Sequence, residues 1–267
     1  MGKIIAFANQ KGGVGKTTTC LNIAAYMALM GKKVLMIDID PQGNATSGLG
    51  VQKNSEVNSI YQVISEDCLP EEAVVKTNID GLDLLPANID LAGVEVELVG
   101  KKDRERVFKR IIDKIKNSYD YITIDCPPSL GLITVNALTA ADSVCIPMQC
   151  EFFSLEGLSQ LMNSIRLIKK TGLNPDLQIE GVVLTMRDSR SNLGKQVADE
   201  IIKFFGNAVF ETSIPRNVRL AESPSYGMPV YLYDKNCTGS QAYLKLTEEI
   251  LTKNHDKFKK LRVKKIN

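Results

Sequence analysis

No stretch of this 267-residue sequence stays apolar for the roughly 20 residues that a helix needs to cross a bilayer. The first residues also lack the basic segment and longer apolar segment of an export signal, because a short apolar run begins almost at once. We therefore expect a protein that is neither exported nor membrane-spanning, with no stable membrane insertion and a cytoplasmic location.

Paired cysteine motifs are missing as well. The sequence has six cysteines but no Cys-x-x-Cys pair, and several of them lie in apolar runs typical of buried strands or helices. This pattern favours reduced thiols in a cytosolic protein. The cysteines are Cys20, Cys68, Cys126, Cys145, Cys150 and Cys237.

Charge of one sign is not in excess, since 33 Lys and Arg stand against 31 Asp and Glu, a formal net charge of +2. Any nucleic-acid surface must therefore be a local patch. We find no internal repeat and no low-complexity linker, and the length fits one large α/β domain. Composition changes only near the end, so we divide the chain into one large domain over 1–252 and a basic tail over 253–267.

What the sequence does contain is a series of short apolar runs separated by helical periodicity. Such runs are typical of parallel strands that are buried on both faces, and the first forty residues form a βαβ unit. We predict a doubly wound, mostly parallel sheet flanked by helices. The predicted strands are 3–9, 33–37, 82–85, 121–124, 144–148 and 179–185, with a short one at 209–210, and the clearest predicted helices are 17–30, 104–115 and 155–168.

A glycine-rich loop between the first strand and the first helix reads Lys-Gly-Gly-Val-Gly-Lys-Thr. Backbone N–H groups and a helix dipole face an anion at this position, so a phosphate-binding loop is favoured over an ordinary glycine turn. In such a loop Lys16 reaches the β- and γ-phosphates of ATP, and the Thr17 hydroxyl takes one position on Mg²⁺. The candidate phosphate-binding residues are Lys11, Gly12, Gly13, Val14, Gly15, Lys16, Thr17 and Thr18.

The loop departs from the usual pattern, because Gln10 stands where the first glycine is expected and Lys11 follows it. With this second lysine it resembles the deviant Walker A loop of the ParA/MinD ATPases. The chain as a whole, from Lys3 to about Leu251, resembles the ParA/Soj family of partitioning ATPases. The resemblance implies that Lys11 reaches the nucleotide of a partner subunit in an ATP-dependent homodimer; spacing alone supports only a cation near phosphate.

Two aspartates, Asp38 and Asp40, follow the second predicted strand, at the edge where an open α/β sheet binds its ligand. The neighbouring Asp-Pro and Gln-Gly pairs are also ordinary turn formers. The resemblance implies that Asp40 activates the attacking water, and that Asp38 supports the Mg²⁺ shell and the first switch segment.

Asp125 ends another apolar run and fits a Walker B acid that holds Mg²⁺ through water. By resemblance, 127–131 is a second switch segment that senses the γ-phosphate. The adjacent Cys126 raises an alternative, the iron–sulfur electron donor related to this loop type. Cluster ligation needs converging thiolates, however, and Cys126, Cys145 and Cys150 lack a matching spacing.

The remaining site residues come from the resemblance. The turn at Pro215 and Asn217 is expected to pack against adenine, and Arg190 and Arg219 match arginines that bind DNA nonspecifically. A few exposed guanidinium groups grip phosphates without reading bases, and an ATP-induced dimer adds two such patches. Without the resemblance, loop arginines are usually only solvated, and a proline turn is the default.

The function implied is an ATP-hydrolysing, nucleoid-associated DNA-segregation switch that a ParB-like partner stimulates. The tail from Lys253 places Phe258, Leu261, Val263 and Ile266 among lysines, which is also the pattern of a basic amphipathic membrane anchor. A MinD-type membrane-positioning ATPase therefore stays open as the alternative.

Overall fold

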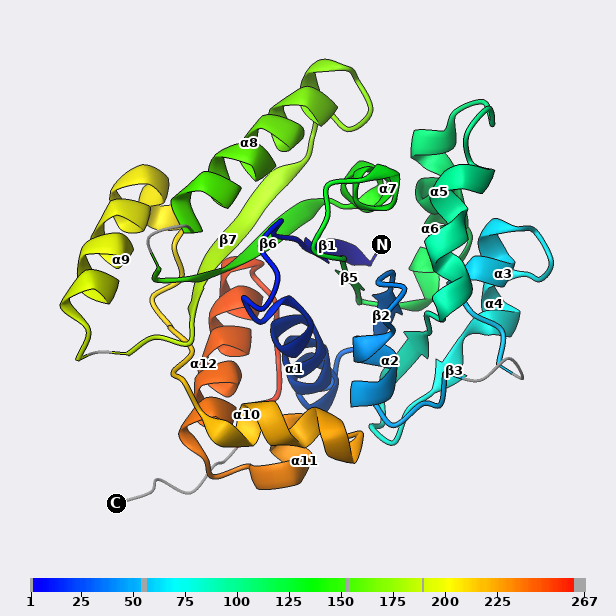
Figure 1. The fold of residues 1–267 in the computed structure, drawn as a ribbon. Coiled ribbons are helices and arrows are strands. Elements are labelled where there is room, and N and C mark those ends of the chain that lie inside the picture. Colours follow the sequence, from blue (N-terminus) through cyan, green and yellow to red (C-terminus); the bar gives the residue numbers. More distant parts are fainter. Residues whose placement is uncertain (1, 54–56, 152–153, 189, 262–267) are drawn as a thin grey trace.

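The computed structural model describes residues 2–53, 57–151, 154–188 and 190–261, with the backbone alone for 154–156. Seven strands form one sheet in the order β3-β4-β2-β5-β1-β6-β7 (Figure 1). Neighbouring strands pair in parallel, except that β3 runs antiparallel to β4 at the edge. The predicted sheet is confirmed. Its strands are β1 (Lys3–Phe7), β2 (Val34–Asp38), β3 (Val75–Lys76), β4 (Leu82–Leu85), β5 (Tyr121–Asp125), β6 (Ser143–Gln149) and β7 (Gln178–Thr185).

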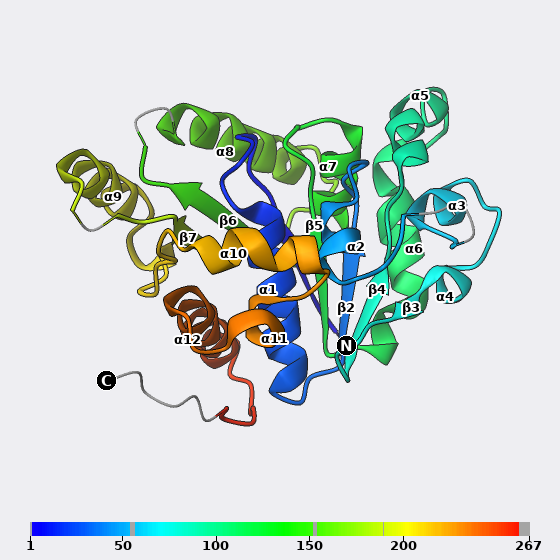
Figure 2. The same ribbon diagram turned by 60° about the horizontal axis from the view of Figure 1, so that its bottom comes forward.

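Helices cover both faces of this sheet. One face carries α1 (Lys16–Leu29), α2 (Asn44–Gly48), α10 (Val218–Glu222), α11 (Val230–Asp234) and α12 (Thr238–Lys253). The other carries α3 (Ile60–Ile64), α4 (Pro70–Ala73), α5 (Val94–Glu97), α6 (Val107–Ile115), α7 (Leu132–Ala140), α8 (Ser154–Lys170) and α9 (Asn192–Phe205). Figure 2 shows α10 and α11 lying across α1 and α12. Along the described parts of the chain, no helix is long and apolar enough to pass through a membrane.

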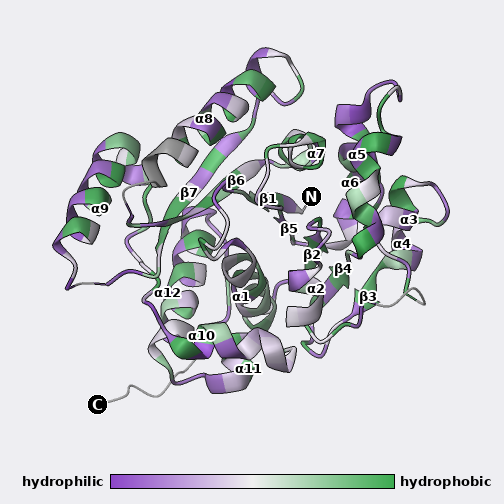
Figure 3. Ribbon diagram, viewed as in Figure 1, coloured by the Kyte–Doolittle hydropathy of each residue, from purple (hydrophilic) through white to green (hydrophobic). Residues whose placement is uncertain are grey.

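The strand sequences explain the two layers. Successive side chains of a strand point to opposite faces, so Ile4 and Ala6 enter one core while Ile5 and Phe7 enter the other. Because both faces are covered, the strands are mostly apolar, and polar bands appear mainly on the outer helices such as α8 and α9 (Figure 3).

The parallel arrangement decides where a site can form. β1, β2, β5, β6 and β7 all end at one edge, where the chain leaves each strand in a loop. β1 lies between β5 and β6. The strand that follows it in sequence, β2, lies on the β5 side, whereas β6 and β7 lie on the other side. Ligands of open α/β sheets bind at such a reversal of strand order.

Two local expectations differ from the structure. The predicted strand at 209–210 is only an isolated bridge between Val182 and Val209, because the Glu249 carboxylate takes the backbone N–H groups of Glu211 and Thr212 that would continue a ladder. The predicted helix 104–115 begins with a 3₁₀ turn, η2 (Arg104–Arg106), before α6.

Candidate nucleotide-binding site

The loop between β1 and α1 is shaped for close approach to an anion. Gly13 and Gly15 have φ of +73° and +82°, a left-handed conformation that favours glycine, and a Cβ at Gly13 would meet open space. Gly15 caps α1 without a side-chain hydrogen bond, and the first turn of α1 holds no acid. The positive end of the helix dipole is therefore left for a bound anion.

Polar residues at the ends of two neighbouring strands hold this loop in place. The Thr185 hydroxyl at the end of β7 donates to the Val14 carbonyl (2.8 Å), and the Gln149 amide at the end of β6 donates to the Gly13 carbonyl (3.2 Å). Neither Thr185 nor Gln149 was given a role in the sequence analysis. The feature that could have indicated one is that each is a polar residue at the end of an apolar run.

Lys16 is buried within the loop, and its ammonium donates to the Lys11 carbonyl (3.1 Å). Burial lowers the pKa of Lys16, while the nearby carboxylates of Asp125 and Asp40 oppose that shift. The fold thus brings Lys16 together with two of the three predicted carboxylates. A buried ammonium beside a helix N-terminus can neutralise phosphate charge in surroundings where water screens it little.

Asp125 is buried at the end of β5, and among the described residues neither carboxylate oxygen has a hydrogen-bond partner. Burial raises the pKa of Asp125 well above its usual range, the charge of Asp38 adds to the rise, and the Thr17 hydroxyl and Lys16 oppose it. An unpartnered buried carboxylate beside a threonine hydroxyl fits a hydrated Mg²⁺, which usually keeps several waters.

Asp38 sits opposite Asp125 in the register of β2 and β5 but is fully engaged. One oxygen accepts from the backbone N–H and the hydroxyl of Thr46 (2.8 Å each), and the other accepts from the Asp40 N–H (3.1 Å). Burial raises the pKa of Asp38 to about 6 despite these bonds. Asp38 therefore organises the segment 40–46, whereas Asp125 has the free oxygens. Thr46 is a third residue to which the sequence analysis gave no individual role, although it lies only eight residues after Asp38.

Asp40 and Lys11 occupy the rim of the site. Asp40 is nearly buried, and its carboxylate accepts from the Gln42 N–H (2.9 Å). The Lys11 side chain points out of the loop, where its ammonium lies 2.7 Å from the Glu151 carboxylate, and Glu151 is itself largely exposed. Lys11 is thus the most solvent-accessible of the three predicted catalytic side chains.

A cavity of about 320 Å³ adjoins the phosphate loop, within the usual range of small-molecule sites. Its walls are mostly apolar, which suits a flat base, and Thr18 joins it to the loop. Pro215 and Asn217 both line it. The lining residues are Gly15, Thr18, Thr185, Met186, Ile214, Pro215, Arg216, Asn217, Leu220, Ala221 and Tyr243.

Arg190 and Arg219 are exposed and lie on neighbouring segments. Arg187 forms a parallel bridge with Pro215, which puts the loop carrying Arg190 beside the turn that leads to α10 and Arg219. Exposed Arg187 and Arg216 lie in the same two segments. The structure therefore places four arginines on two neighbouring segments, and one of them, Arg216, lines the base cavity.

The cysteines and the described part of the tail, up to residue 261, offer no comparable site. Burial raises the pKa of the Cys126 and Cys145 thiols, which keeps them neutral, and within the described ranges no cluster of three or more His, Cys, Asp or Glu could hold a metal. Phe258 and Leu261 of the tail pack on the core beside α1 and α12. Val263 and Ile266 lie outside the described residues.

Comparisons with known proteins agree with this geometry. A family model described as an AAA domain matches residues 2–179. The chain is 56% identical over 250 residues to the sporulation initiation inhibitor protein Soj of Bacillus subtilis, covering 94% of this chain and 98% of that protein. It is 49% identical over 257 residues to the chromosome partitioning protein ParA of Caulobacter vibrioides, covering 96% of each.

Solved structures share the fold. A cobyrinic acid a,c-diamide synthase from Mycobacterium smegmatis, bound to an ATP analogue and magnesium, matches with a TM-score of 0.85 at 35% identity over 97% of this chain and 98% of that one. The cell division ATPase MinD of Pyrococcus furiosus matches with a TM-score of 0.78 at 28% identity over 94% and 99% of the two chains. With the identities to Soj and ParA, these matches show that the chain belongs to the ParA/Soj family of chromosome-partitioning ATPases.

Proposed function

We propose that this chain is an ATP-driven DNA-segregation switch in which Mg-ATP closes a homodimer that binds DNA without sequence preference. The observation that carries the proposal is the buried Asp125 carboxylate, unpartnered among the described residues, beside Thr17 and Lys16 at an uncapped helix N-terminus. This arrangement brings together one buried carboxylate, one buried ammonium and the free N–H groups of the helix N-terminus. A magnesium-bound triphosphate provides a cation for the carboxylate and phosphate oxygens for the ammonium and the N–H groups.

In this proposal Thr17 and Asp125 hold Mg²⁺, with Asp38 acting through the segment 40–46 that it organises. Bound Mg²⁺ neutralises charge on the phosphate oxygens. A relative of known structure supports magnesium as the metal, since the Mycobacterium smegmatis synthase was solved with an ATP analogue and magnesium.

Hydrolysis is assigned to three side chains. Asp40 orients and deprotonates the attacking water, Lys16 stabilises charge on the β- and γ-phosphates, and Lys11 adds a second positive charge from the partner subunit. The partly exposed position of Lys11 supports this role, because a fully buried lysine could not reach another chain. Turnover stays slow until a ParB-like partner stimulates it.

DNA binding is assigned to Arg190 and Arg219, with Arg187 and Arg216 beside them. Contacts of this kind to phosphates carry no sequence information and weaken steeply with salt. The base cavity lies next to these arginines and shares Arg216 with them, so nucleotide and DNA would bind at adjoining surfaces.

The test is cosedimentation with random-sequence duplex DNA in Mg-ATP, Mg-ADP or no nucleotide, repeated at rising salt. We expect binding only with ATP and a steep loss above physiological salt. The Arg219→Glu variant should still dimerise with ATP but not bind DNA. Unchanged DNA binding by Arg219→Glu would show that the surface is misplaced.

A membrane-positioning role is the alternative suggested by the basic tail and by the likeness to MinD. Phe258 and Leu261, two of the four apolar residues that such an anchor would use, are packed on the core. Flotation with anionic liposomes in the presence of ATP separates the two roles, because a DNA switch of this kind should stay in the soluble fraction.

A further inference from the structure

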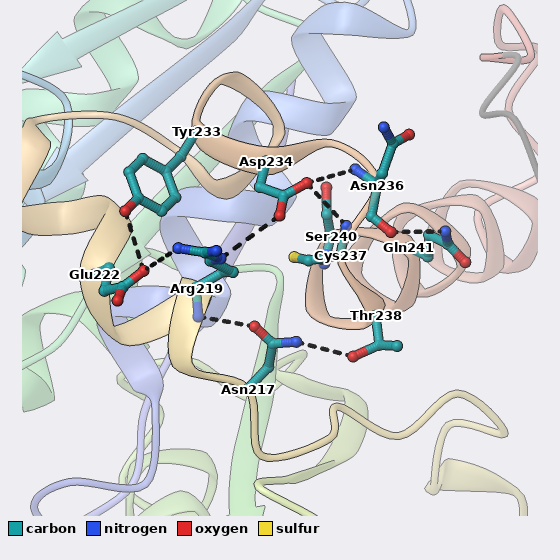
Figure 4. Close-up of polar contacts among 10 residues, drawn as sticks. All are labelled: Asn217, Arg219, Glu222, Tyr233, Asp234, Asn236, Cys237, Thr238, Ser240 and Gln241. Carbon is teal, nitrogen blue, oxygen red and sulfur yellow. Dashed lines mark hydrogen bonds and ion pairs between the residues drawn. The ribbon is translucent and has the colours of Figure 1, made fainter. Parts of the chain in front are cut away.

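Arg219 does not extend freely into solvent. Its guanidinium lies between two acids, with Nη1 2.9 Å from Glu222 Oε2 and Nε 3.7 Å from Asp234 Oδ2 (Figure 4). The ring of Tyr233 lies 6.0 Å from the guanidinium carbon, and its hydroxyl donates to the same Glu222 oxygen (3.0 Å). The arginine assigned to DNA phosphate is therefore already engaged by carboxylates.

The two acids differ in what else they hold. Asp234 also accepts from the backbone N–H groups of Asn236 (3.0 Å) and Cys237 (3.1 Å), so it fixes the turn into α12. Among the described residues, the Glu222 carboxylate has two hydrogen-bond partners, the side chains of Arg219 and Tyr233. These two hold the pKa of the Glu222 carboxyl below its usual range, so it is ionised at neutral pH. Of the two acids, Glu222 is the one that can swing away without disturbing the backbone.

Arg190 repeats the arrangement. Its Nε and Nη2 lie 3.1 Å and 3.2 Å from the two carboxylate oxygens of Asp188. A carboxylate presents two oxygens to the guanidinium fork much as a phosphate does, so an acid in this position competes directly with DNA for the same donors. Both arginines proposed to bind DNA thus carry an intramolecular competitor.

We propose that Glu222 acts as a built-in competitor of DNA phosphate for Arg219, and so weakens the grip of the ATP dimer on DNA to a level that permits release. This inference rests on the proposed DNA-binding function. Exposed ion pairs are individually weak, at most a factor of about five, but the dimer contains two copies, and their effects multiply.

The test compares Glu222→Gln with wild type for binding to a random-sequence DNA duplex, with Mg²⁺ and a nonhydrolysable ATP analogue holding the dimer closed. We expect the variant to bind about fivefold more tightly or better. The matched control is Glu200→Gln on α9, which removes the same charge from an exposed position that is not paired with Arg219. Thermal melts establish that both variants are folded.

A double-mutant cycle shows whether the effect passes through Arg219. In an Arg219→Ala background, measured at a salt concentration low enough for the remaining arginines to give measurable binding, Glu222→Gln should no longer tighten binding. The inference is overturned if Glu222→Gln binds no more tightly than Glu200→Gln, or if its gain persists without Arg219. Loss of DNA binding in Arg219→Ala without a gain in Glu222→Gln removes only this inference, whereas unaltered binding by Arg219→Ala removes the proposed DNA surface as well.

Discussion

The Lys11 ammonium lies 2.7 Å from the Glu151 carboxylate, so the lysine proposed to serve a partner subunit is held by its own chain. To reach across a dimer interface it must first leave Glu151. Both side chains are partly exposed, and such a pair costs little to break. The contact therefore keeps the lysine in place without trapping it.

We expect Glu151→Gln to favour the ATP dimer, because two such pairs are broken for each dimer formed. The dissociation constant of the dimer should fall severalfold, each pair contributing up to about a factor of five. Sedimentation velocity across a protein concentration series measures it. Lys11→Ala is the control and should fail to dimerise with ATP. A Glu151→Gln dimer as weak as wild type, or weaker, would contradict the idea that this contact competes with dimerisation.

Lys16→Ala should abolish nucleotide binding, with a loss of affinity of at least about a hundredfold, because it removes the buried cation within the loop. Isothermal titration calorimetry with Mg-ATP measures the loss. The fold should persist, since burial already disfavours the charged ammonium in the free protein. Full-affinity binding by this variant would contradict the assignment of the loop.

Asp125→Asn should weaken ATP binding selectively when Mg²⁺ is present. The variant removes the unpartnered carboxylate but keeps its shape, so the affinity for ATP in EDTA should change little while the gain from adding Mg²⁺ drops about tenfold or more. Titrations of ATP with and without Mg²⁺ give both numbers. Equal magnesium dependence in variant and wild type would exclude Asp125 as a magnesium residue.

Asp40→Ala should slow ATP hydrolysis by roughly a hundredfold or more while leaving ATP binding intact, as expected for loss of a general base. The dimer should then remain on DNA after excess ATP is removed. Phosphate release measures the first effect and dissociation from immobilised DNA the second. If the variant dimer left DNA rapidly although its hydrolysis is blocked, hydrolysis would not be the step that releases the dimer from DNA.

Glu180 gives a prediction about stability and pH. It is only 3% exposed, and its carboxylate accepts from Lys3 (2.6 Å), Ser143 (2.6 Å) and Asn254 (2.8 Å). Burial by itself would raise the pKa of Glu180, but the hydrogen bonds and the charge of Lys3 outweigh burial and lower it. A lowered pKa in the folded state stabilises the protein above the unfolded pKa of about 4.3, and this is lost as pH falls through the folded value.

Glu180→Gln should therefore destabilise the protein at pH 7 by about 3 kcal/mol, because it leaves the Lys3 charge unpaired. The difference from wild type should shrink below about pH 4, where the carboxyl begins to protonate in the unfolded wild-type chain. Urea unfolding at pH 7 and at pH 3.5 measures both. A difference that stays constant between the two pH values would contradict the account.

The sequence was sufficient for the elements that local chemistry specifies. The apolar runs at 3–9 and 121–124 contain β1 and nearly all of β5, and the glycine pattern located the loop where left-handed glycines occur. The partners of individual side chains could not be predicted from the sequence, because they depend on which distant segments of the chain come into contact. Nothing near Val14 in the sequence indicates Thr185, and nothing near Arg219 indicates the roles of Tyr233 and Asp234.

Asn254, the residue after α12, hydrogen bonds with Lys3 at the first residue of β1, while the phosphate loop leaves the last residue of that strand. Four residue steps along β1, about 13 Å, thus separate the two regions along the sheet. A fluorescent label attached at the end of α12 would therefore lie at the far rim of the sheet, away from the subunit-pairing surface proposed around Lys11. Such a label should leave ATP-dependent pairing undisturbed.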